Sequence, residues 1–166
     1  VEIAISHPLI RSRAQNLSIR AGYAYRDSRT TINGGLPQPD DLTNVIYAGA
    51  TYDLADAYRG VSLVSFEIHQ GFSGTESSNS IASRNGDSNF TNYKLNLSRL
   101  QNLYVPHLNV LFAGEATYTP DQLLASQEFA YGGGQFGRGY DASEINGDYG
   151  AAGLVELQYG QSLGGK

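Results

Sequence analysis

The residues most suggestive of chemistry lie in the segment GGGQFGRGYD, Gly132 to Asp141, where five glycines surround a single arginine. Three of these glycines match the G-x-G-x-x-G spacing of dinucleotide-binding loops. That loop requires a preceding strand and a following helix whose N-terminus meets the pyrophosphate. The residues that follow, RGYDASEINGDYGAAG, have no helical period, so we do not expect a nucleotide site here.

Other catalytic and metal chemistries also lack their residues. The chain has no Cys and no G-x-S-x-G motif, and its three histidines are scattered without metal-ligand spacing. The acidic segment DASEINGD, 141–148, misses the ligand order of a calcium loop. With a net charge of −5 and no basic stripe, the chain does not predict nucleic-acid binding. We therefore predict no enzyme activity, catalytic residue, metal or cofactor.

Arg138 then stands as the one fixed cation of the glycine-rich segment, and two interpretations remain open. In the first it is a surface arginine whose neighbouring glycines make turns. In the second the segment enters a polar lumen, where glycines let the backbone pass close to the wall and Arg138 pairs with a wall carboxylate. Phe136 and Tyr140 flank the arginine at i−2 and i+2, so an extended loop would place all three side chains on one face.

The elements that must position this segment are strands, because apolar and polar residues alternate with period two along most of the chain. In LSIRAGYAYRD, for example, Leu17, Ile19 and Tyr23 alternate with small or charged residues. The same alternation predicts seven strands near 1–6, 17–27, 45–54, 61–71, 92–100, 107–119 and 151–159. Their polar faces carry Arg20, Arg26, Asp53, Glu67, His69, Lys94, Glu115 and Glu156.

Strand length and loop length favour a transmembrane β-barrel. Most segments have the roughly 9–11 residues that cross a bilayer when tilted. Long connections at 27–44, 71–89 and 119–149 alternate with short ones at 54–60 and 101–106, as in outer-membrane barrels. This parity holds if 127–133 is a local extended stretch within the loop 119–149. The eight charged residues above would then face the lumen, and the 12 tyrosines would form interfacial belts.

A soluble β-sandwich that binds glycans through tyrosine is the alternative from another class, since its strands would alternate too. Its outer face would carry more Lys and Glu than the Gly, Ser, Thr and Asn found here. The fold class predicted is therefore all-β, an antiparallel up-and-down transmembrane barrel, of which this chain supplies about seven strands. Because residue 1 is not Met, we expect the chain to be part of a longer protein.

A resemblance to a known family covers essentially the whole chain. QFGRGYD, preceded by LLASQEF and followed by SEINGDYGAAGLVEL, resembles the loop-six signature of two-partner secretion transporters of Gram-negative bacteria. These are the haemolysin-activator and haemagglutinin-exporter barrels. SHPLIRSRAQNLSIRAGYAYRDSRT and YDLADAYRGVSLVSFEIHQG resemble barrel segments of the same family.

The resemblance implies a monomeric 16-stranded barrel in the bacterial outer membrane, contacting its lipid and exporting a haemolysin- or haemagglutinin-like polypeptide. It assigns 119–149 to loop six and the functional motif to Phe136, Gly137, Arg138, Gly139, Tyr140 and Asp141. It also implies that the acidic partner of Arg138 lies beyond Lys166, so that this contact cannot form within the chain. A barrel-assembly or lipid-exporting relative is the second possibility in the same fold class.

Overall fold

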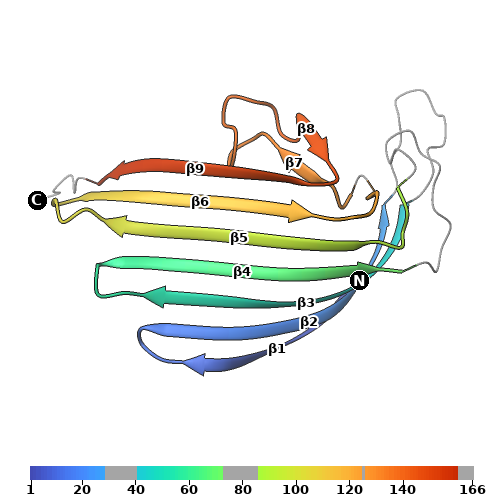
Figure 1. Cartoon of the computed structure of the whole chain (residues 1–166), viewed down its shortest axis with the longest axis horizontal. Coiled ribbons are helices and arrows are strands. Elements are labelled where there is room, and N and C mark those ends of the chain that lie inside the picture. Colours follow the sequence, from blue (N-terminus) through green and yellow to red (C-terminus); the bar gives the residue numbers. More distant parts are fainter. Residues whose placement is uncertain (29–40, 73–85, 125, 161–166) are drawn as a thin grey trace, which may run out of the picture.

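The computed structural model describes residues 1–28, 41–72, 86–124 and 126–160. Seven long strands form one antiparallel sheet in the order β1-β2-β3-β4-β5-β6-β9, and two short strands form a separate ribbon (Figure 1). The long strands are β1 (Glu2–Arg11), β2 (Gln15–Ser28), β3 (Asp41–Ala55), β4 (Gly60–Gly71), β5 (Thr91–Asn102), β6 (Leu108–Tyr118) and β9 (Gly150–Tyr159). The ribbon pairs β7 (Phe129–Tyr131) with β8 (Ile145–Gly147).

The seven predicted strands are confirmed, although several are longer than the alternation indicated. β1 runs for 10 residues with a register shift between Pro8 and Ile10, which is how a strand accommodates a proline without a ladder N–H. β2 and β3 have 14 and 15 residues, because polar residues beyond Tyr25 still pair across the two strands. The sequence pattern missed these extensions because no apolar alternation marks them.

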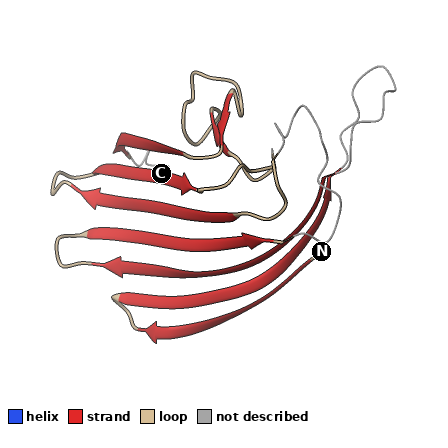
Figure 2. Cartoon of the chain, turned by 45° about the vertical axis from the view of Figure 1, so that its right-hand side comes forward, coloured by secondary structure: helices blue, strands red, loops and turns tan. Residues whose placement is uncertain are grey.

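The strand register sorts the side chains onto two faces of a curved sheet (Figure 2). On one face, here called the apolar face, Phe66, Leu97, Phe112 and Val155 are 42%, 45%, 46% and 69% exposed. Tyrosines flank this band at both strand ends: Tyr93 stacks on Tyr118 at one end, with ring centroids 6.3 Å apart, while Tyr159 lies at the other. An exposed apolar band between aromatic rims is typical of the outer surface of a membrane barrel.

The sandwich alternative is wrong for this chain. A sandwich requires a second sheet packed about 10 Å away against the apolar face. The described residues form one long sheet and a ribbon of two three-residue strands, and the large side chains of the apolar face stay exposed rather than meeting in a dry centre. The chain is instead a segment of an open sheet whose edges are β1 and β9.

The opposite face, here called the polar face, is not polar along its whole length. Beside the charged residues it carries an apolar patch toward the short turns, which the alternation pattern did not reveal. The patch consists of Val61, Leu63, Leu100, Leu111 and Leu154, which are aligned across β4, β5, β6 and β9. Val61, Leu63 and Leu100 are 54%, 45% and 39% exposed.

The short connections and the connection 119–149 lie at opposite ends of the sheet (Figure 1). Turns at 12–14, 56–59 and 103–107 occupy one end, and the connection 119–149 joins the neighbouring strands β6 and β9 at the other. Arg59, Tyr104 and His107 take positive φ angles of about 60° in these turns. In the described part of the chain, no helix is long and apolar enough to cross a membrane.

In the part of the chain that the structure describes, a buried apolar cluster sits at the end of the sheet where the connection 119–149 begins, and not in the middle of the sheet. Val45 of β3, Phe90 and Leu123 form this cluster, and Leu124 beside Leu123 is also 1% exposed. Since Leu123 and Leu124 belong to the β6–β9 connection, the cluster fastens that connection to the sheet.

The two faces predict opposite responses to a new charge at adjacent positions of β4. Phe66→Arg places a cation on the apolar face and should destabilise the membrane-inserted full-length protein by about 2–4 kcal/mol, the cost of Arg near the bilayer midplane. Ser65→Arg, on the polar face, should cost about 1 kcal/mol or less. Denaturant unfolding in lipid vesicles measures both. Equal costs would contradict the assignment of the faces.

Candidate functional site

The candidate site is the polar face of the sheet together with the connection 119–149 folded over it. Register alone brings charged residues from neighbouring strands into one row: Arg20 pairs with Gly49, Gly49 with Glu67, and Glu67 with Lys94. By the same register all eight charged residues predicted for the lumen lie on this face: Arg20, Arg26, Asp53, Glu67, His69, Lys94, Glu115 and Glu156.

These eight residues do not form one cluster. Arg20, Arg26, Glu67, His69 and Lys94 line a single pocket near the long-connection end. Asp53 lies toward the short turns, where its carboxylate accepts a hydrogen bond from Asn16 Nδ2 at 2.8 Å. Glu115 and Glu156 lie on β6 and β9, away from that pocket.

The pocket contains two residues that the sequence did not single out, Glu2 and Tyr47. Arg20 Nη2 donates to Glu2 Oε1 at 2.6 Å, and the Tyr47 hydroxyl donates to the same oxygen. The Arg20 guanidinium also lies 5.1 Å from the centre of the Tyr47 ring. The parity of β3 would have placed Tyr47 on this face, but its aromatic character favoured the membrane belt.

The pocket holds further polar contacts and is covered by the connection. His69 Nε2 lies 3.0 Å from Glu67 Oε2, and the His69 ring stacks on Tyr47 with centroids 5.5 Å apart. Ser126 and Gln127 of the connection form part of its lining. Asn92 Nδ2 donates to the Gln127 carbonyl at 3.4 Å. Among the described residues, no group of three or more His, Asp or Glu could hold a metal ion.

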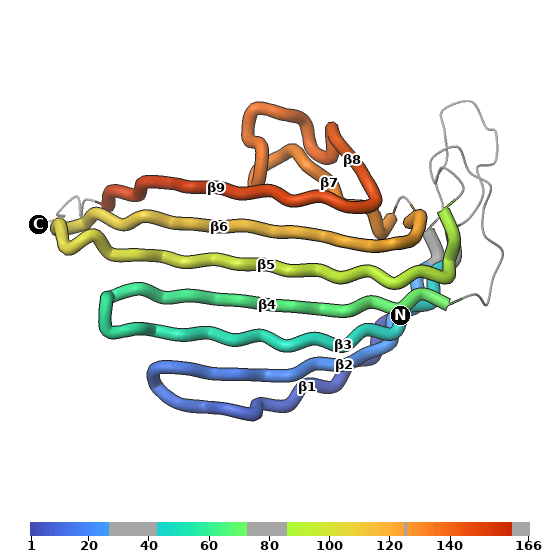
Figure 3. The backbone as a smooth tube through the Cα atoms, viewed as in Figure 1, coloured from blue at the N-terminus to red at the C-terminus, as the bar shows by residue number. Residues whose placement is uncertain are grey.

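The connection leaves the sheet at the end of β6 and doubles back alongside β9 (Figure 3). Leu123 and Leu124 anchor its first part, and the Leu123 N–H donates to Asp148 Oδ1 at 3.0 Å. The ribbon of β7 and β8 then carries the glycine-rich segment toward the middle of β9. The segment 127–133 therefore contributes to a local ribbon and not to an eighth long strand.

The glycine-rich segment contains a tight turn, as in the first of the two interpretations left open by the sequence, and not an extended loop. The Tyr140 N–H donates to the Gly137 carbonyl at 2.9 Å, and Gly137 has φ +80°. As a result Phe136 is 5% exposed and lines a cleft with Asn96 and Ala113, whereas Tyr140 is 51% exposed. The shared face of Phe136, Arg138 and Tyr140 was expected only for an extended loop, and here Phe136 is buried while Tyr140 is exposed.

Two of the glycines are required by the local backbone. A Cβ on Gly132 would lie 2.1 Å from the Asp141 carbonyl oxygen, and one on Gly137 would lie 2.8 Å from the Tyr131 ring. Gly139 differs: no atom lies within 4 Å of a Cβ at that position. The nearby Asp141 is exposed, with its N–H donating to Glu144 Oε2 at 3.1 Å. Local packing thus explains Gly132 and Gly137 but not Gly139.

Arg138 has an acidic partner among the described residues, whereas the resemblance implied a partner beyond Lys166 and no contact within the chain. Arg138 Nη1 lies 2.8 Å from Glu156 Oε2 on the polar face of β9. The two oppositely charged groups form an ion pair at close range but without a well-aligned hydrogen bond at that oxygen. Arg138 Nε also donates to the Gly134 carbonyl at 3.3 Å. The sequence analysis did not consider Glu156 as the partner of Arg138, because the family resemblance implied a carboxylate on a later strand.

The ion pair is too exposed to be the main anchor of the connection. The Arg138 side chain is 63% exposed and that of Glu156 is 27% exposed. Solvent screens a pair in such surroundings, so it adds little to stability, whereas removing a buried aromatic side chain costs about 3–5 kcal/mol. Phe136, Leu123 and Leu124 therefore hold the connection against the sheet, and Arg138 can exchange partners at low cost.

Comparisons with known proteins agree with this geometry. A profile of the family described as haemolysin secretion/activation protein ShlB/FhaC/HecB matches residues 1–165. Among solved structures, CdiB from Escherichia coli is similar with a TM-score of 0.82 and 19% sequence identity, over 99% of this chain and 31% of that protein. The chain thus spans about a third of the length of this relative. No curated protein matches the sequence.

Hydrogen exchange at the turn distinguishes the two kinds of anchor. Phe136→Ala in the full-length protein should speed exchange of the Tyr140 N–H about 100-fold, because roughly 3 kcal/mol of packing is lost. Arg138→Ala should speed it less than about fivefold, as expected for an exposed ion pair. A larger effect of Arg138→Ala than of Phe136→Ala would contradict this ranking.

Proposed function

We propose that this chain, which belongs to the haemolysin secretion/activation family (ShlB/FhaC/HecB), forms part of an outer-membrane barrel that exports a partner polypeptide. In this proposal the apolar face contacts lipid and the polar face lines the lumen. The partner is a large haemolysin- or adhesin-type protein that crosses unfolded, and the transporter performs no bond chemistry. The loop motif Phe136 to Asp141 acts on that passage from within the lumen.

The observation that carries the proposal is the position of the connection 119–149 over the polar face. In a closed barrel this face is the lumen, so a connection held there by Phe136 and the Leu123–Leu124 anchor would narrow the passage. A channel that passes a polypeptide must open such an obstruction and close it again. The exposed Arg138–Glu156 pair can separate at little cost, which suits a contact that is broken in each cycle.

The chemistry of the polar face suits an unfolded polypeptide. It offers both charge signs, such as Glu67, Lys94 and Glu115, and the apolar patch that contains Leu63 and Leu100. An unfolded chain presents charged, polar and apolar side chains in turn. A lumen lined by only one of these kinds of residue would bind the matching segments of that chain and hold them back. The family match favours secretion over the barrel-assembly or lipid-exporting alternative.

Secretion by loop variants of the full-length protein tests the proposed role of Arg138. Arg138→Ala should abolish export of the cognate partner while the barrel still assembles, because the loop loses the cation that its lumen contacts require. Arg138→Lys keeps the charge but not the planar fork, and should leave partial export. Export is measured as partner protein in the medium, and assembly as heat-modifiable migration of the transporter on gels.

The matched control is Arg13→Ala, which removes an exposed arginine from the short turn 12–14 and should leave export unchanged. Normal export by Arg138→Ala would overturn the role assigned to the loop motif. Absence of the wild-type protein from the outer-membrane fraction would overturn the proposed function as a whole.

A further inference from the structure

A groove crosses the apolar face where two glycines oppose each other. Gly114 of β6 pairs with Gly153 of β9. A Cβ on either would meet no atom closer than 3.5 Å, so neither glycine is needed for backbone packing. Their missing side chains leave a depression of about 460 Å³. Its apolar walls are Val64, Leu97, Phe112 and Val155.

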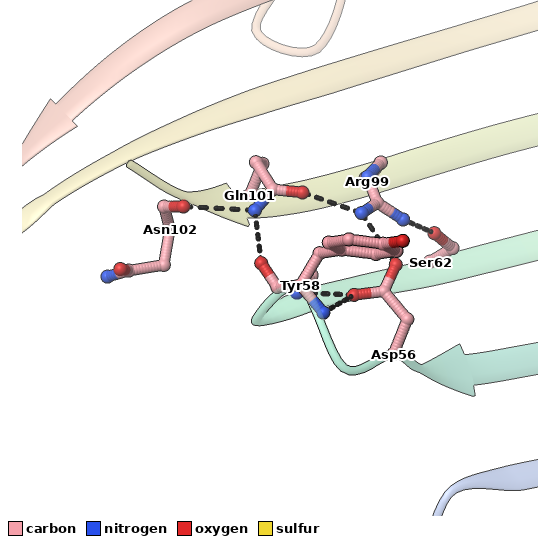
Figure 4. Close-up of polar contacts among 7 residues, drawn as sticks. Asp56, Tyr58, Ser62, Arg99, Gln101 and Asn102 are labelled. Carbon is pink, nitrogen blue, oxygen red and sulfur yellow. Dashed lines mark hydrogen bonds and ion pairs between the residues drawn. The ribbon is translucent and has the colours of Figure 1, made fainter. Parts of the chain in front are cut away.

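The groove ends at a guanidinium. Arg99 and Ser62 line it on the side of the short turns, in the register row next to that of the two glycines. Arg99 Nη1 donates to Ser62 Oγ at 2.7 Å, and its Nη2 donates to Asp56 Oδ2 and to Gln101 Oε1, each at 2.6 Å (Figure 4). Arg99 is thus a cation at the polar margin of the apolar face, next to Ser62 and Gln101.

The surroundings of Arg99 fix its orientation. A Cβ on Gly60 would lie 2.1 Å from Arg99 Nη2, so only glycine leaves room for the guanidinium there. Asp56 Oδ1 accepts the N–H groups of Tyr58 and Gly60, each at 3.0 Å. The Arg99 guanidinium, and then the Gly60 N–H, lower the pKa of Asp56, which is therefore ionised at neutral pH. Among the described residues, these contacts use three of the five N–H donors of Arg99 and leave two for a ligand.

The end of the sheet that carries this cluster has the residues of a lipid headgroup region. The Arg59 guanidinium lies 5.0 Å from the centre of the Tyr104 ring, and Tyr104 is 60% exposed. Tyr58 and Tyr159 are 72% and 65% exposed at the same end. Tyrosine and arginine together are typical of the membrane–water interface, where the anionic group within reach is a lipid phosphate.

We infer that the groove binds one phospholipid of the leaflet at the short turns, with an acyl chain over Gly114 and Gly153 and the phosphate at Arg99. This inference rests on the proposed function, because it requires the apolar face to lie in a bilayer. The apolar walls suit a hydrocarbon chain, and the two unused Arg99 donors suit phosphate oxygens. Arg59 supplies a second cation at the same end of the sheet.

A second groove on the apolar face provides an internal control. It also measures about 460 Å³ and is lined by Ile5, His7, Ile19, Ala21 and Ala48 of β1, β2 and β3. The arginine in its lining, Arg20, has its guanidinium on the polar face, bonded to Glu2. This groove can therefore hold a hydrocarbon chain but has no clustered arginine for a phosphate.

Native mass spectrometry of the detergent-purified full-length protein tests the inference, with dioleoyl phosphatidylethanolamine and dioleoylglycerol as probes. These lipids share their acyl chains, and only the first has a phosphate. The wild type should retain the phospholipid roughly tenfold better than dioleoylglycerol. Arg99→Gln should remove this preference. Gly114→Leu, which fills the groove and leaves Arg99 in place, should reduce binding of both lipids, whereas Ala48→Leu in the second groove should leave the preference intact.

Four outcomes would overturn the inference: equal retention of the two lipids by the wild type, an unchanged preference in Arg99→Gln, undiminished binding of both lipids by Gly114→Leu, or selective retention of lipopolysaccharide over the phospholipid. Partner export and outer-membrane localisation are measured in the same cells. Normal localisation and export without lipid preference would refute the lipid site alone. A wild-type protein absent from the outer membrane would refute the proposed function.

Discussion

The alternation of side chains across one hydrogen-bonded sheet is the constraint on which the rest of the structure depends. Because paired residues share a face, the register that aligns Arg20, Gly49 and Glu67 also aligns the apolar residues one position away. A slip of one residue in any strand would place charges in the apolar band. The charged pocket, the aromatic rims and the glycine groove all follow from this single register.

The connection 119–149 depends on that register in turn. It can fold over the polar face only because β6 and β9 are neighbours, which puts its two ends on adjacent strands. Its buried contacts come from Leu123, Leu124 and Phe136, and its charged contact is exposed. Apolar packing therefore supplies most of the stability of the docked loop, and the Arg138–Glu156 pair adds little. The ion pair can then break without loss of the packing that holds the loop. No close contact in this conformation requires glycine at position 139. If the loop has a second conformation, the need for glycine there would arise in that conformation.

Much of this fold could be predicted from the period-two pattern alone. Alternation of apolar and polar residues indicates where a strand lies and which of its side chains share a face. The prediction failed where that pattern stops: at the polar extensions of β2 and β3, and at the apolar patch of Val61 and Leu63 on the polar face. The sequence left undecided whether the glycine-rich segment turns or extends, because its glycines allow both backbones, and only the structure shows that Phe136 is buried and Tyr140 exposed. The Arg138–Glu156 contact needed three-dimensional information, since 17 residues separate the two positions along the chain.

The central claim is that the two faces of the sheet meet different solvents, and cysteine labelling tests it most directly. Single cysteines are placed at successive positions of β4 from Val64 to His69 in a cysteine-free full-length protein in intact outer membranes, and the 166 residues of this chain need no replacement for that because they contain no Cys. A water-soluble maleimide should label positions 65, 67 and 69, while positions 64, 66 and 68 should react only with a lipid-soluble reagent. Uniform labelling, or labelling in the opposite phase, would contradict the account.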